Sequence, residues 1–256
     1  MKHRPLKHLL HKYSAVVLMA VILFLEIRRG YFKDLRFRLR SLSWRPYLVS
    51  FASLAVFAVS LLFVDSVILD WIQDRHSFVA KAIVDGGGWV GRSTHCWMVL
   101  AGVYVVSYCL RLEKGRRYFF SALLSSFIAS TLVVIFKFVF LRARPCSNLG
   151  PFSFFHLRGL LQDDNLFQGF PSGDVVVVAG AAGYFFHASK NRYLNWLWLL
   201  PPLATAFSRM HLDRHWPSDV FFSLGLGLLI ARFVLDFKEI QKNRSDRKIK
   251  EDLSVP

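Results

Sequence analysis

Cysteine and acidic residues are both scarce in this chain of 256 residues. The three cysteines, Cys96, Cys109 and Cys146, are odd in number and lack the spacing of metal ligands. This excludes a disulfide framework and a zinc site. Asp and Glu number 17 against 33 Lys and Arg, while 54% of the chain is hydrophobic. That combination excludes disorder, argues against an ordinary cytosolic enzyme and is typical of a multispan membrane protein.

The apolar residues gather in runs that are long enough for transmembrane helices. A further run, 13–27, has only 15 residues, so it is either a short span or a segment lying in the interface. Arg28 and Arg29 follow it directly where a signal peptide would have small residues, so we expect no cleavage. We predict an all-α integral membrane protein with a six-helix core and this extra short N-terminal hydrophobic segment. The six core spans are expected at 47–64, 96–110, 118–136, 174–188, 193–207 and 219–237.

Positive charge orients this core. If the span from Tyr47 runs from inside to outside, 24 of the 33 Lys and Arg residues fall on one side, which the positive-inside rule assigns to the cytoplasm. If the segment 13–27 also spans, the division becomes 20 against 13 and the core keeps its orientation. We therefore expect a basic N-terminal region at 1–46, a membrane domain at 47–237 and a charged cytoplasmic tail, solvated and partly disordered, at 238–256.

Three polar motifs then fall on the non-cytoplasmic side. Lys137 ends an apolar run and Arg144 follows seven positions later, so both cations point the same way if the helix continues that far. The segment 171–174, Pro-Ser-Gly-Asp, stands at the start of the next helix, where free backbone N–H groups can bind phosphate. Taken singly, such a Lys is usually an interfacial anchor and such a Ser a helix cap.

The third motif runs from Ser208 to Asp219. Pro217 is expected in the first turn of the last helix, with Asp219 near its N-terminus and His215 just ahead of it. A carboxylate four residues after an imidazole can hold the proton of one ring nitrogen and leave the other as a nucleophile. A metal site here is disfavoured because Pro217 interrupts the helix, and we expect no metal.

Together the motifs resemble the type 2 phosphatidic acid phosphatase (PAP2) family, in its branch of membrane lipid phosphatases. The family pattern is Lys, six residues, Arg-Pro; then Pro-Ser-Gly-His; then Ser-Arg, five residues, His, three residues, Asp. Order and spacing match throughout, over roughly 47–237, and imply the six-helix core of that family. The matching positions are Lys137, Arg144, Pro145, Pro171, Ser172, Gly173, Ser208, Arg209, His215 and Asp219.

The resemblance implies a role for each of these side chains. His215 would be the nucleophile that forms a phosphohistidine, and Asp219 would orient it. Clustered cations and N–H donors suit the charge of a phosphoryl-transfer transition state. The residues implied to bind the phosphate are Lys137, Arg144, Ser172, Gly173 and Arg209.

One position departs from the family pattern: Asp174 stands where the family has the His that protonates the leaving group. A carboxylate beside three cations should be ionised at neutral pH and is a poor acid there. Three outcomes stay open: Asp174 acts as the acid at low pH, the substrate is a phosphoanhydride whose leaving group needs little protonation, or turnover is lost and only binding remains. His211 or His156 could replace the acid, although a structural role is the simpler interpretation.

The implied activity is removal of phosphate from a lipid phosphate or lipid pyrophosphate at the non-cytoplasmic face, without a cofactor. The alternatives are a lipid phosphotransferase that uses the same phosphohistidine and a non-catalytic lipid-phosphate-binding relative. The expected partners are the membrane and the lipid substrate. The basic stretch 28–45 indicates anionic headgroups rather than nucleic acid. We expect a bacterial inner membrane protein with a periplasmic site; the oligomeric state stays open.

One further spacing is set aside. Gly86, Gly88 and Gly91 fit the spacing of a dinucleotide-binding loop, but no strand precedes them. We interpret them as a turn or a re-entrant bend.

Overall fold

The computed structural model describes residues 21–29, 48–74, 77–157, 165–189, 191 and 193–253. These residues form helices and irregular segments and no strand, which confirms the predicted all-helical class. Residues 21–28 are helical. The later elements are α2 (Leu48–Val59), η3 (Ser60–Val64, a π-helical turn), α3 (Asp65–Gln73), α4 (Phe78–Gly91), α5 (Ser93–Cys109), α6 (Glu113–Phe140), η4 (Pro145–Ser147), η5 (Asn165–Phe167), α8 (Gly173–Ala188), η6 (Leu194–Leu199), α9 (Leu200–His211) and α10 (Pro217–Leu253).

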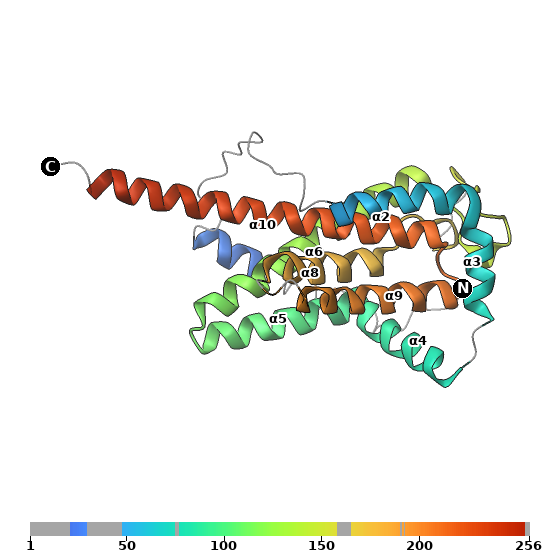
Figure 1. Ribbon diagram of the computed structural model, residues 1–256, viewed down its shortest axis with the longest axis horizontal. Helices are drawn as coiled ribbons and strands as arrows, with labels where there is room; N and C mark the ends of the chain where they lie inside the picture. Colours follow the sequence, from blue (N-terminus) through green and yellow to red (C-terminus); the bar gives the residue numbers. More distant parts are fainter. Residues whose placement is uncertain are drawn as a thin grey trace.

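The long helices lie side by side, and α8 is at their centre (Figure 1). It packs against α6, α9 and α10, and the ten residues from Val175 to Tyr184 are all buried. Small residues allow this close packing: a Cβ at Gly227 of α10 would lie 2.8 Å from the backbone nitrogen of Gly180. A helix that is apolar all round is expected to be surrounded on every side, as α8 is.

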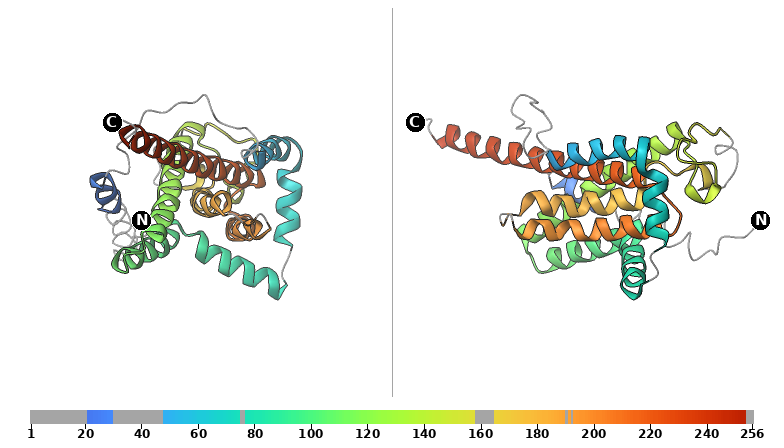
Figure 2. Two further views of the ribbon diagram at one scale, coloured as in Figure 1. Left: turned by 60° about the vertical axis from the view of Figure 1, so that its left-hand side comes forward. Right: turned by 45° about the vertical axis from the view of Figure 1, so that its right-hand side comes forward.

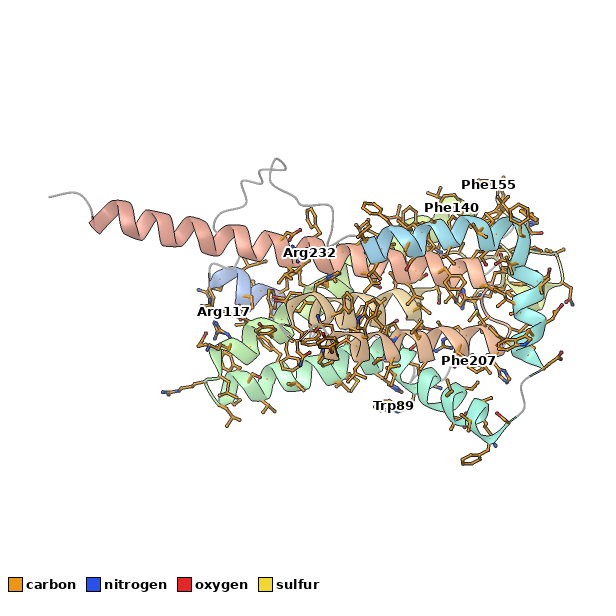
Figure 3. The ribbon with its side chains drawn as sticks, in the orientation of Figure 1. Trp89, Arg117, Phe140, Phe155, Phe207 and Arg232 are labelled. Atoms are coloured by element: carbon orange, nitrogen blue, oxygen red, sulfur yellow. The ribbon has the colours of Figure 1, made fainter. Side chains whose placement is uncertain are left out.

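Helix α3 turns across one end of the bundle, and α4 lies obliquely beside it (Figure 2). Side chains distinguish the two ends. Phe140 and Phe155 lie toward the end that α3 crosses, and Arg117 and Arg232 toward the opposite one (Figure 3). The end with Phe140 is called the site end below, and the opposite end the far end.

Three helical segments are long and apolar enough to cross a membrane: Leu48–Gln73, Glu113–Ser147 and Pro217–Asp236. Gly173–Ala188 is a shorter apolar helix. Each of the six predicted spans coincides with a helical element, but the number of six stays a prediction. The outer surface is apolar: Phe63 is 75% exposed. Many other large apolar side chains are exposed as well, as expected for a surface in contact with lipid.

The short N-terminal hydrophobic segment packs against α5 and α6 over the part that the structure describes. Ile22 is buried in the same apolar cluster as Tyr104 and Phe120. Glu26 is buried as well and accepts a hydrogen bond of 2.7 Å from the Tyr104 hydroxyl. Residues 13–20 lie outside the described residues, so whether the segment spans stays a prediction.

Two expectations are wrong. The tail was expected to be partly disordered, but α10 continues to Leu253. Between Lys238 and Leu253 the sequence contains no Gly or Pro and many helix formers, which explains the continuation. The stretch Gly86 to Gly91 is not a turn but the last part of α4. Its glycines serve packing, because a Cβ at Gly91 would lie 2.3 Å from Thr205 Cγ2 of α9.

The contact between α4 and α9 gives a first prediction. A Cβ at Gly87 would lie 2.2 Å from the Ala204 carbonyl oxygen, whereas one at Gly86 would meet nothing within 4 Å. We expect Gly87→Ala to lower the free energy of unfolding by about 1–3 kcal/mol through overpacking. Gly86→Ala should be neutral or stabilise by up to about 1 kcal/mol, because Ala favours the helix. Thermal unfolding of the two variants in detergent measures this, and equal melting temperatures would contradict the packing.

Candidate active site

The first motif lies where α6 ends. Lys137 is in its last turn, and the helix stops at Phe140 because Leu141 adopts a left-handed conformation with φ 42°. The helix therefore does not continue to Arg144. The prediction that Lys137 and Arg144 point the same way required a continuous helix, so that condition is not met. Arg144 is extended, as expected for the residue before Pro145, and its backbone N–H donates to the Leu166 carbonyl at 2.9 Å.

The second motif opens α8 as predicted, with Ser172 at the N-cap and Gly173 as the first helical residue. The Ser172 side chain makes no capping hydrogen bond, which removes the simple cap interpretation. Its backbone N–H donates to Ser223 Oγ at 2.8 Å. A Cβ at Gly173 would lie 3.8 Å from Lys137 Nζ, so the ammonium group lies close to the start of α8. A helix N-terminus with a cation beside it attracts an anion.

The third motif places His215 directly before α10, which begins at Pro217 as predicted. His215 is buried, and its Nδ1 lies 2.7 Å from the Gly169 carbonyl oxygen. Asp219 Oδ2 is farther away, at 3.7 Å from the same nitrogen. Because a carbonyl oxygen only accepts, Nδ1 carries the ring proton and Nε2 has the free lone pair. Gly169 thus provides the shorter orienting contact, which the sequence did not indicate.

The imidazole of His215 is neutral at neutral pH. Burial lowers the pKa of His215 to about 4; Asp219 opposes this shift, and the charges of Arg144 and Lys137 add to it. A group whose pKa is lowered loses its proton earlier as pH rises, so the lone pair of Nε2 is available well below pH 7. A neutral imidazole is the nucleophilic form.

Asp174 is held between two other elements. Its Oδ2 lies 3.1 Å from Arg209 Nε, and its Oδ1 accepts a hydrogen bond of 3.1 Å from Ser93 Oγ at the start of α5. Arg209 also donates to the Gly88 carbonyl at 3.4 Å. The carboxylate is therefore paired with Arg209 and lies within the electrostatic reach of Arg144, two of the three cations expected beside it.

Several polar atoms near His215 lack a hydrogen-bond partner. Among the described residues, nine buried side-chain nitrogen or oxygen atoms have none, and three of these belong to predicted phosphate-binding residues. They are Ser172 Oγ, Arg144 Nε and Arg209 Nε. The geometry from Arg209 to Asp174 is an ion pair without a hydrogen bond. Buried donors without partners are rare and call for an explanation. An anion bound at this place would satisfy them.

Comparison with known families bears on this arrangement. The family model of the PAP2 superfamily matches residues 114–242, half of the chain and all three motifs. The chain belongs to the PAP2 superfamily. No curated protein sequence matches it significantly. Among solved structures, the crystal structure of Aquifex aeolicus LpxE is similar, with 20% identity and a TM-score of 0.49, over 68% of this chain and 95% of that one.

A buried ion network underlies the PAP2 motifs, and sequence reasoning missed it. Arg142 is fully buried, and its guanidinium forms salt bridges with Asp65 of α3 and Asp219 of α10. It also donates to Ser218 Oγ at 2.7 Å and to the Pro151 carbonyl at 2.6 and 2.9 Å. This one side chain therefore connects α3, α10 and the loop that carries Arg144.

Asp65 completes this network from outside the PAP2 match. It accepts hydrogen bonds from the Ser218 backbone N–H at 2.8 Å and hydroxyl at 2.5 Å, and from Ser60 Oγ at 2.9 Å. In the sequence, no feature distinguishes Arg142 from the other arginines at the ends of the predicted spans. An acidic residue directly after the apolar run 47–64 was the one available signal for Asp65.

The two histidines considered as substitute acids have other contacts. His211 Nδ1 lies 3.1 Å from the Ile72 carbonyl oxygen, and its ring stacks on Phe207. The ring of His156 lies against Phe167, with centroids 5.0 Å apart. These contacts favour the structural interpretation for both histidines.

Two neighbouring arginines are expected to differ in their roles: Arg142 stabilises the fold, whereas Arg144 is a predicted ligand-binding residue. This gives a second prediction. Arg142→Met should lower the free energy of unfolding by about 3–5 kcal/mol, because it leaves two buried carboxylates unpaired. Arg144→Met should change stability far less, because a guanidinium nitrogen that it removes has no partner. Chemical denaturation in detergent compares them. A larger loss for Arg144→Met would contradict the structural role of Arg142.

Proposed function

We propose that this chain is an integral membrane phosphatase that removes phosphate from a lipid phosphate or a lipid pyrophosphate through a phosphohistidine. Membership of the PAP2 superfamily and the apolar outer surface support this function. The observation that carries it is the pair of unpartnered polar atoms on Ser172 and Arg144, together with a neutral His215 that lies within the electrostatic reach of Arg144 and Lys137. No other ligand class fits donors of this charge as well as a phosphate group.

The reaction has two steps. Nε2 of His215 attacks phosphorus, a P–N bond forms, and the bond between phosphorus and the leaving oxygen breaks. The leaving oxygen takes a proton from an acid or from water. Water then attacks phosphorus, the P–N bond breaks, and inorganic phosphate leaves with the imidazole restored. Throughout, Nδ1 keeps its proton, which it donates to the Gly169 carbonyl oxygen, so Nε2 stays free for attack.

The phosphate oxygens would be bound by groups from four elements. Arg144 and Arg209 would donate through their guanidinium groups, Lys137 through its ammonium, and Ser172 and Gly173 through hydroxyl and backbone N–H. Asp219 would act from behind: it accepts a hydrogen bond from the Trp216 backbone N–H at 2.9 Å and so fixes the turn that carries His215. Arg142 holds that carboxylate and is a positioning residue.

The proposed topology has six core spans in a domain at 47–237, with the site end on the non-cytoplasmic side. The positive-inside count supports it, because 24 of 33 Lys and Arg fall on the opposite side. An aromatic cluster supports a position of the site end at one of the two membrane interfaces: Phe140 contacts Phe154, Phe155 and Phe170. Aromatic side chains gather at membrane interfaces. In a bacterial inner membrane this end would face the periplasm.

The pairing of Asp174 with Arg209 supports one alternative, a non-catalytic relative that only binds a lipid phosphate. Because its carboxylate is paired with Arg209, a phosphate dianion must compete with it for that cation. A non-catalytic lipid-phosphate-binding relative needs no acid at this position, whereas a phosphatase needs a proton donor for the leaving oxygen while this carboxylate is paired with Arg209. A phosphotransferase would use the same first step and pass the phosphoryl group to a second lipid instead of water.

Loss of the nucleophile gives the third prediction. Purified protein in detergent should release phosphate from a lipid monophosphate or pyrophosphate, and His215→Ala should lower the rate by about 10³-fold or more, because no phosphohistidine can form. The control is His211→Ala, which should retain activity. Acid-labile ³²P on the wild-type chain, absent from His215→Ala, identifies the intermediate. Equal release by both variants would contradict the assignment of the nucleophile.

The charge of Asp174 gives the fourth prediction. Asp174→Asn removes a carboxylate beside the bound dianion, so inhibition by orthovanadate at pH 7 should become tighter by roughly tenfold or more. Asp174→His should raise phosphate release at neutral pH. An unchanged inhibition constant in Asp174→Asn would show that the carboxylate does not face the bound anion.

A further inference from the structure

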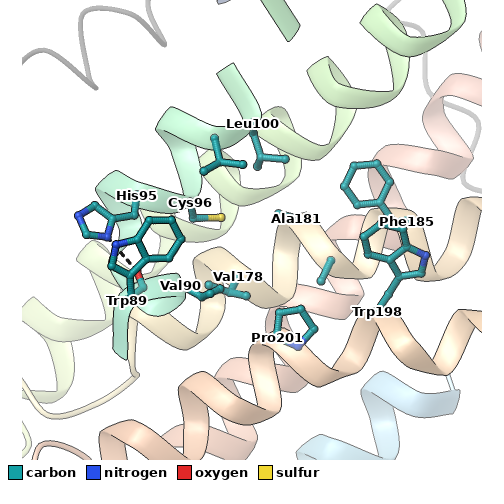
Figure 4. A pocket seen from close by; sticks show the side chains of 12 residues that line it. Trp89, Val90, His95, Cys96, Leu100, Val178, Ala181, Phe185, Trp198 and Pro201 are labelled. Carbon is teal, nitrogen blue, oxygen red and sulfur yellow. Dashed lines mark hydrogen bonds between the residues drawn. The ribbon is translucent and has the colours of Figure 1, made fainter. Parts of the chain in front are cut away.

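An apolar cavity of about 220 Å³ lies between α5, α8 and the segment that leads into α9 (Figure 4). Its walls are apolar side chains from several elements, among them Val99, Leu100, Val178, Ala181 and Pro201. The cavity is smaller than the pockets that hold whole drug-sized molecules. It therefore suits one slender apolar group, part of a larger ligand.

Asp174 and part of the cavity wall lie on one face of α8. Asp174, Val178, Ala181 and Phe185 follow each other at helical spacing, so they share that face. Val178 lies one turn beyond Asp174. At a rise of about 1.5 Å per residue, Phe185 lies about 16 Å from Asp174 along the helix axis. Ser93 of α5, which donates to Asp174, is followed closely by the lining residues His95 and Cys96. Gly88 of α4, which accepts from Arg209, is followed directly by the lining residue Trp89.

The cavity also opens to the apolar surface of the bundle. Its lining residue Val99 is 52% exposed and Trp89 is 57% exposed. At one end of the cavity, His95 Nδ1 lies 3.0 Å from the Trp89 carbonyl oxygen, to which it can donate a hydrogen bond (Figure 4). A ligand can therefore enter from the lipid side while its polar group stays at the site end.

An aromatic pair lines the cavity at the end away from Asp174. The rings of Phe185 and Trp198 stack with centroids 4.7 Å apart and an interplanar angle of 27°. Figure 4 shows this pair at one end of the cavity and Trp89 with His95 at the other. A stacked pair of large rings is a fixed wall, because each ring restrains the other.

We propose that this cavity holds one acyl chain of the lipid phosphate, and that the Phe185–Trp198 stack limits the length of chain that fits. The inference rests on the proposed function, because it assumes a phosphate at His215. An acyl chain gains little free energy by leaving the equally apolar bilayer. The effect of the cavity is therefore to position the lipid and to exclude chains that are too long, rather than to increase affinity.

The test compares a series of lipid phosphates that differ only in acyl length, together with a water-soluble phosphate monoester without a chain. For the wild type, kcat/KM should fall by roughly tenfold once the chain exceeds the cavity. Trp198→Ala removes part of the wall and should move this limit to longer chains. The control is Trp196→Ala, since Trp196 packs on Phe186 and does not line the cavity; it should keep the wild-type limit.

A second pair of variants fills the cavity instead of lengthening it. Val99→Phe should lower kcat/KM for the long-chain lipids by roughly tenfold and leave the soluble ester unchanged. Val106→Phe is the matched control, because Val106 lies two turns farther along α5, is 55% exposed and does not line the cavity. A length profile that is the same in the wild type and Trp198→Ala, or no length dependence at all, would overturn the inference.

The soluble ester separates the two proposals. Hydrolysis of that ester by the wild type, lost in His215→Ala, supports the proposed function whatever the length profile shows. If no substrate is hydrolysed, the proposed function fails, and the cavity is tested by binding alone. A non-hydrolysable lipid phosphonate with a bromine at the chain end should quench wild-type and Trp196→Phe fluorescence more than that of Trp198→Phe. Equal quenching in all three would overturn the inference.

Discussion

Arg142 occupies a position in the protein interior where a charge is tolerated only if it is fully paired. Two carboxylates, Asp65 and Asp219, and the Pro151 carbonyl provide that pairing. These partners come from α3, α10 and the loop after α6, so the network fixes three elements at the site end relative to one another. Since Asp219 also binds the Trp216 backbone N–H, the position of His215 depends on a guanidinium that does not itself face the proposed phosphate.

The same network determines the charge that remains at the site. Arg142 offsets one of the two negative charges of Asp65 and Asp219. Beside this network, Asp174 offsets one of the three positive charges of Lys137, Arg144 and Arg209. A cluster with this excess of positive charge, with buried donors that lack partners, is unfavourable unless an anion binds. Burial keeps His215 neutral beside these cations, so the proposed nucleophile is uncharged while the proposed anion-binding groups are positively charged.

Local rules predicted the parts of the structure that depend on neighbouring residues. The starts of α8 at Gly173 and α10 at Pro217 follow from capping and proline preferences. The end of α6 at Phe140 did not follow, because the left-handed Leu141 is set by loop packing rather than by its own preference. The pairing of Asp65 with Arg142 joins residues 77 positions apart, and no periodicity encodes such a contact.

Helix α8 combines three functions that place different demands on its sequence. Its first turn needs little bulk beside the Lys137 ammonium group, which Gly173 provides. Its middle must pack against α6 and α10 at close range, which Gly180 allows. One face, at Val178 and Ala181, must leave room for the apolar cavity. Larger residues would strengthen the apolar contacts of this helix but fill that space, so the small residues along α8 are explained by packing and by the proposed lipid chain together.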